Sequence, residues 1–119
     1  MAVGAEFQAF VLDLLAPLRP NARRMFGGVG LLGEGMMFAL LANDAMFFRV
    51  DAQTRPAFQD AGCEPFRYQR GGRAVAIESY YMVPDTLYDQ PDALVAWARE
   101  ALAAARRGKS PRPRRAPAR

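Results

Sequence analysis

The sequence predicts a single α+β domain, in which antiparallel strands form a sheet and helices pack on it. At both ends, in residues 5–15 and 91–107, apolar side chains recur with the spacing of an amphipathic helix. Between these ends, short apolar or alternating runs are separated by Gly, Asn and Asp, as in β-hairpins. The order α-β-β-β-α-β-β-α therefore indicates a two-layer sandwich with a sheet of about five strands.

The first half of the predicted domain is a helix followed by a meander. Residues 5–15 form the helix, and Pro17 and Pro20 end it because proline cannot donate to the helical ladder. Two short β-like runs follow at 23–26 and 29–32, around Gly27 and Gly28, and two further runs lie at 36–42 and 45–50, with a tight turn at Asn43-Asp44. We interpret the whole region as a three-stranded antiparallel meander. In the last run, one face is expected to carry Met46, Phe48 and Val50, and the other Phe47 and Arg49.

The second half is predicted to be a short helix, a hairpin and a long helix. The short helix spans residues 51–61, with Asp51 as its N-cap and Gly62 in the left-handed position after it. Residues 66–70 and 73–83 are the strands of a hairpin that turns at Gly71-Gly72. The last helix starts at Pro91, and Gly108 is expected to cap it.

The charge of the chain is concentrated in its last twelve residues. Five of the sixteen basic residues lie there without any acid, which leaves eleven bases against twelve acids and a charge of about −1 in the rest. We therefore expect a domain over residues 1–107 and a disordered basic tail over 108–119. Such a tail favours weak, salt-sensitive contact with nucleic acid, and the residues expected to make it are Arg106, Arg107, Lys109, Arg112, Arg114, Arg115 and Arg119.

Several kinds of catalytic and metal site are disfavoured by the composition. The chain has no histidine and one cysteine, Cys63, so it lacks the residues of Ser-His-Asp catalysis and of a Cys/His zinc site. The twelve acids are scattered, so an enzyme based on carboxylates or tyrosines would need a pocket in which at least two of them converge. Residues 28–33 spell GxGxxG, but the following residues read as a strand rather than as the helix that a dinucleotide site requires. We expect no cofactor, no metal and no catalytic residue.

Aromatic residues on the predicted hairpin and its neighbour leave two interpretations open. Alternating aromatics such as Phe66, Tyr68, Tyr80 and Tyr81 can stack single-stranded bases, but cross-strand aromatic pairs also stabilise ordinary sheets. The single cysteine, the lack of a long apolar segment and the lack of a signal-peptide pattern point to the cytoplasm and not to a membrane.

The chain resembles the N-terminal domain of the TfoX/Sxy family of competence regulators. The most specific blocks are RMFGGVGL at residues 24–31 and SYYMVP at 79–84. The similarity covers roughly residues 7–107, and the other matching blocks are 35–40, 48–51, 54–58, 62–68 and the helix around Leu94 and Trp97-Ala98.

The resemblance implies an α+β fold and a regulatory role in DNA uptake or related transcription, without enzymatic activity. It identifies the chain with the stand-alone proteins of that type, which lack the second, C-terminal domain of the full-length regulators. A transcription regulator or polymerase is then the expected partner, contacted through exposed arginines: Arg23, Arg24, Arg49 and Arg55. The alternative is a chaperone-like or homodimeric interaction module with no nucleic-acid role.

Overall fold

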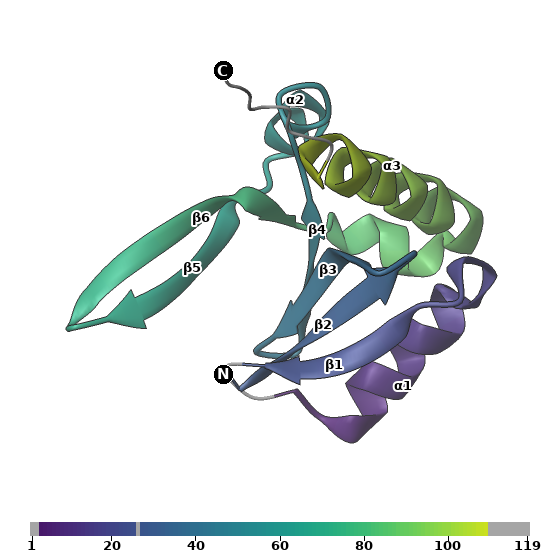
Figure 1. Cartoon of the computed structure of the whole chain (residues 1–119), viewed down its shortest axis with the longest axis horizontal. Coiled ribbons are helices and arrows are strands. Elements are labelled where there is room, and N and C mark those ends of the chain that lie inside the picture. Colours follow the sequence, from purple (N-terminus) through teal and green to yellow (C-terminus); the bar gives the residue numbers. More distant parts are fainter. Residues whose placement is uncertain (1–2, 26, 110–119) are drawn as a thin grey trace, which may run out of the picture.

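Six antiparallel strands form one curved sheet, in the order β1-β2-β3-β4-β6-β5 (Figure 1). The computed structural model describes residues 3–25 and 27–109. The strands are β1 (Asn21–Met25), β2 (Gly28–Gly33), β3 (Met36–Ala42), β4 (Ala45–Arg49), β5 (Pro65–Arg70) and β6 (Arg73–Met82). The α-helices are α1 (Ala5–Leu14), α2 (Arg55–Asp60) and α3 (Pro91–Lys109), and the 3₁₀ helices are η1 (Ala16–Leu18) and η2 (Asp85–Asp89).

The predicted α+β class is confirmed, and the sheet has one strand more than the expected five. The additional strand arises because β1 and β2 are separate partners in the meander, which has four strands rather than three. The turn between β3 and β4 is as tight as expected, because Asn43 and Asp44 both adopt left-handed backbone conformations, with φ of 54° and 53°.

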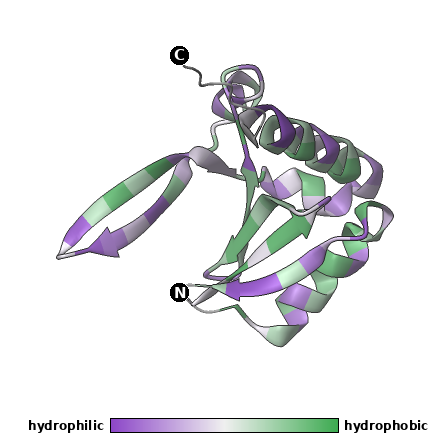
Figure 2. Ribbon diagram, viewed as in Figure 1, coloured by the Kyte–Doolittle hydropathy of each residue, from purple (hydrophilic) through white to green (hydrophobic). Residues whose placement is uncertain are grey.

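The main core lies between the sheet and the helices α1 and α3. The alternation predicted for β4 is confirmed, since Met46, Phe48 and Val50 belong to this core whereas Phe47 belongs to a separate cluster on the opposite face. The amphipathic stripe of α3 supplies Leu94, and Trp97 packs on α2 through an edge-to-face contact with Phe58 at 4.8 Å. Figure 2 shows that hydrophobic residues are concentrated on the central strands.

Two helix boundaries differ from the predictions. Helix α2 starts at Arg55 and not at 51, because the Asp51 carboxylate accepts hydrogen bonds from the backbone N–H groups of Gln53 and Thr54 and so holds a turn before the helix. The prediction that Gly108 caps the last helix is wrong, because α3 continues through it to Lys109. The first two residues of the expected tail are therefore helical.

The β5–β6 hairpin extends away from the rest of the sheet (Figure 1). Strand β6 pairs with β4 only through Tyr80, Tyr81 and Met82, whereas its earlier residues pair with β5 alone. The predicted Gly71-Gly72 turn is confirmed, with φ of 59° and 79°. No helix in the described part of the chain has the length and apolar character needed to span a membrane.

Candidate functional site

An apolar groove lies on the face of the sheet that the helices do not cover. A second apolar cluster occupies this face, with Leu40, Phe47, Phe66 and Tyr80 as its main side chains. Beside it is a cavity of about 480 Å³, which we call the concave groove. It is lined by Met25, Met37, Leu40, Phe66, Tyr68, Arg70, Ile77 and Tyr80. Its size is within the range of ligand-binding pockets.

The groove exists because the sheet is curved and because one glycine leaves room for two methionines. The pairing register shifts between Leu31 and Leu32 and again between Pro65 and Phe66, and irregularities of this kind bend a sheet. At Gly30, a Cβ atom would lie only 2.8 Å from Met25 Cε and from Met37 Sδ. The two methionines therefore cover the bare backbone of β2 and form one side of the groove.

The aromatic residues of the groove are held by one another. The Phe66 ring meets Phe47 edge-on at 5.1 Å and stacks on Tyr68 at 6.2 Å. The Tyr80 hydroxyl donates a hydrogen bond to the Met37 carbonyl at 3.2 Å, and burial raises the pKa of Tyr80. Tyr81 lies in the main core on the other face, so the four aromatics considered from the sequence do not form one surface.

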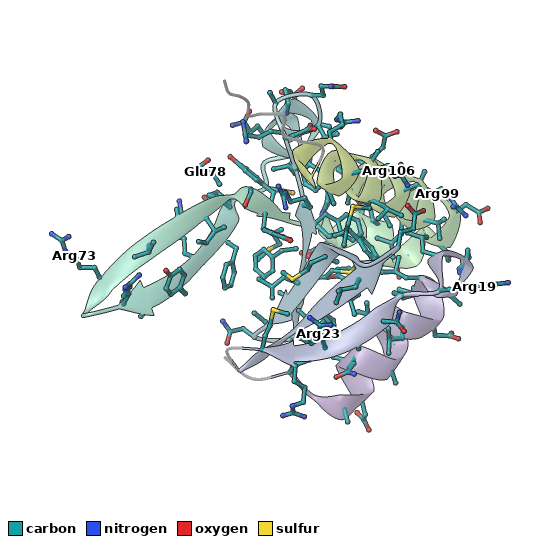
Figure 3. The ribbon with its side chains drawn as sticks, in the orientation of Figure 1. Arg19, Arg23, Arg73, Glu78, Arg99 and Arg106 are labelled. Atoms are coloured by element: carbon teal, nitrogen blue, oxygen red, sulfur yellow. The ribbon has the colours of Figure 1, made fainter. Side chains whose placement is uncertain are left out.

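Two of the four arginines predicted to contact a partner lie close to the groove. Arg23 shares a face of β1 with Met25 and pairs with Gly30, so it stands at the edge of the groove (Figure 3). The Arg49 guanidinium lies 5.9 Å above the Tyr80 ring, and its Nε is buried without a hydrogen-bond partner among the described residues. Arg24 is on the opposite face of β1. Arg55 begins α2 and does not line the groove.

Most of the groove was not predicted from the sequence. This includes Arg70, which is its one charged lining residue within the described chain. A signal was present in β5, where every second residue, Phe66, Tyr68 and Arg70, points to the same face of the strand. The sequence did not show that this face turns toward Met25, because β1 and β5 are at opposite edges of the sheet.

The residues proposed to bind nucleic acid fall into two groups. Arg106 and Arg107 belong to α3 and are paired with acids of the domain, Arg106 Nη2 with Glu34 Oε1 at 3.0 Å and Arg107 Nε with Asp51 Oδ2 at 2.6 Å. The hydrogen bond from Arg107 lowers the pKa of Asp51 from 3.8 to about 2. Lys109 ends α3, whereas the remaining tail residues lie outside the described part of the chain: Arg112, Arg114, Arg115 and Arg119.

The structure places the sequence features that could carry metal, thiol or dinucleotide chemistry. Residues 3–25 and 27–109 contain no group of three His, Cys, Asp or Glu side chains that could hold a metal ion. Burial, together with the charge of Asp85, raises the pKa of the Cys63 thiol, which disfavours the reactive thiolate. All three glycines of the GxGxxG run lie in β2, and strand β3 rather than a helix follows them, as expected. They accommodate the Leu41 carbonyl, the two methionines and the Leu102 side chain.

Comparison with known proteins gives one relative and one family. The chain is 32% identical over 84 residues to the DNA transformation protein TfoX1 of Aliivibrio fischeri, and the matched region is 71% of this chain. It spans only 40% of that relative. The family model described as the TfoX N-terminal domain matches residues 13–105, which include the whole sheet and most of α3. On this match, the chain belongs to the TfoX N-terminal domain family.

Proposed function

We propose that this domain is a non-enzymatic adaptor in the regulation of DNA transformation, and that it acts by binding another protein through the concave groove. The observation that carries the proposal is the apolar lining of the groove, on a sheet face where no helix of the described residues packs. Contiguous apolar surface of this kind is typical of protein-binding sites. The similarity to a DNA transformation protein supports the biological process.

The basic tail has a secondary part in this proposal. Its arginines would add weak, sequence-independent affinity for nucleic acid while the groove selects the protein partner. We place the adaptor in the cytoplasm, where the single thiol of Cys63 remains reduced.

Natural transformation frequency in the source organism tests the proposal. Deletion of the gene should lower the frequency, and the wild-type chain should restore it. Tyr68→Glu, which puts a charge into the groove, should fail to restore it even though its circular dichroism spectrum and expression remain normal. The matched control is Gln69→Glu on the same strand, where the exposed side chain alternates with Tyr68 and Arg70 and so faces away from the groove.

Each part of the proposal has its own contrary result. An unchanged transformation frequency in the deletion strain removes the role in transformation. Full restoration by Tyr68→Glu removes the groove from the mechanism.

A further inference from the structure

We infer that the occupant of the concave groove is an acidic amphipathic helix of a partner protein. This inference rests on the proposed function, because it names the chemistry of the partner that the groove would bind. Four properties of the groove lead to it: its apolar lining, the low exposure of its aromatic rings, the sign of the charges at its margins and the sheet face to which it belongs.

The lining requires apolar side chains in the occupant. Met25, Met37 and Ile77 are half-buried, and they present aliphatic and thioether groups to the cavity. Methionine side chains adapt to differently shaped apolar partners, which suits a surface that binds a helix.

The aromatic rings are poorly placed to bind nucleic acid. Phe66 and Tyr80 are only 7% and 8% exposed. The Phe66 ring is stacked on Tyr68, and the Arg49 guanidinium lies over the Tyr80 ring. Base stacking requires accessible ring faces. Of the three groove aromatics, Tyr68 alone is half-buried, so the groove does not offer the stacking platform that a single strand needs.

The charges at the margins of the groove require acidic side chains in the occupant. Arg23 stands on the β1 side and Arg70 on the hairpin side, and neither has an ion-pair partner among the described residues. Several acids of the domain are already paired elsewhere: Glu34 with Arg106, Asp51 with Arg107 and Glu64 with Arg67. Arginines at an interface favour carboxylates through paired N–H donors.

The same charges exclude the chain's own tail as the occupant. Residues 110–119 contain four arginines and no acid. Placing them between Arg23 and Arg70 would bring like charges together, which disfavours binding.

The sheet face favours a helix. An apolar face of a sheet is normally covered by another layer of secondary structure, and in this chain α1 and α3 cover only the opposite face. A helix places apolar residues at i, i+3, i+4 and i+7 on one side, with its other positions free for charge. Carboxylates on both flanks of that stripe would then meet Arg23 on one side and Arg70 on the other.

Selection from a displayed library of random peptides of about 16 residues, a length that supports a helix, tests the inference without assuming a sequence. The full chain is the bait. Enriched peptides should carry a net negative charge and apolar residues at helical spacing. Synthetic copies of them should gain helical circular dichroism on binding, and their affinity should fall as salt rises from about 0.05 to about 0.5 M.

Paired charge reversals locate the binding. Arg23→Glu combined with Arg70→Glu should weaken the selected peptides at least tenfold. The matched control is Arg24→Glu combined with Arg67→Glu, which reverses the same charges on the opposite faces of β1 and β5 and should change affinity less than twofold.

Several outcomes would overturn the inference. The first is that the selected peptides are basic or do not form helices. The second is that the wild-type bait enriches no more peptide than the Arg23→Glu/Arg70→Glu bait. The third is that both double variants lower the affinity for the peptides equally. Groove-dependent binding of a single-stranded oligonucleotide would also overturn it, as would a groove-dependent dimer of this chain seen by light scattering. If these results appear while Tyr68→Glu still abolishes transformation, the adaptor function stands and only the acidic helix is rejected.

Discussion

The two faces of the sheet are both apolar, but within residues 3–25 and 27–109 the helices cover only one of them. On the helix-covered face, Phe38, Phe48 and Leu41 are completely buried beneath α1 and α3. On the open face, buried Phe66 and Tyr80 lie beside half-buried Met37 and Ile77 at the edge of a cavity. The first face accounts for stability, whereas the second retains apolar surface that a partner can bury.

The difference between the faces originates in two strands. Strand β4 contributes to both, because Met46 and Phe48 face the helices while Phe47 faces the open side. Strand β6 does the same with Tyr81 and Tyr80. Substitutions on these strands can therefore change one face at a time, and they separate stability from binding.

The largest effect is expected on the covered face. Phe48→Ala removes a ring with no exposed surface and should lower the free energy of unfolding by about 3–5 kcal/mol. Ile77→Ala on the open face is the matched comparison and should cost about 1 kcal/mol, because that side chain is only half-buried. Urea denaturation monitored by circular dichroism measures both. Equal losses would show that the two faces do not differ in their contribution to stability.

A smaller effect distinguishes two glycines of β2. A Cβ at residue 28 would lie 2.6 Å from the Leu41 carbonyl oxygen, so Gly28→Ala must move backbone and should cost about 1–3 kcal/mol. At residue 30 the nearest atoms are the flexible ends of Met25 and Met37, so Gly30→Ala should cost less. The same denaturation experiment compares them, and a larger loss for Gly30→Ala would contradict the proposed packing.

Local sequence signals predicted most of the fold but little of the groove. Apolar periodicity indicated α1 and α3, and Gly71-Gly72 marked the hairpin, because these features depend on neighbouring residues. The groove depends on the curvature of the sheet, which brings Met25 and Tyr68 from opposite edges to one cavity. No local pattern encodes that approach. For the same reason, the sequence did not show that Arg106 and Arg107 are paired with acids of the domain.

The smallest effect concerns the end of α3, where Arg107 joins the covering helix to Asp51. Because this contact lowers the pKa of Asp51 to about 2, the charged carboxylate stabilises the fold above its ordinary pKa of 3.8. That stability is lost as the pH falls from about 4 to about 2. Asp51→Asn keeps an oxygen for the N–H groups of Gln53 and Thr54 but removes the charge.

We expect Asp51→Asn to lower the free energy of unfolding at pH 7 by about 1 kcal/mol, which allows for solvent screening of this partly exposed pair. At about pH 2 most of this difference should be gone, because the wild-type carboxylate is then about half protonated in the folded chain and almost fully protonated in the unfolded chain. Urea denaturation at both pH values measures the difference, with Asp60→Asn on exposed α2 surface as the control. If the variant is still less stable than the wild type at low pH, the hydrogen-bonded turn at Asp51, and not the charge of its carboxylate, stabilises the packing of α3 on the sheet.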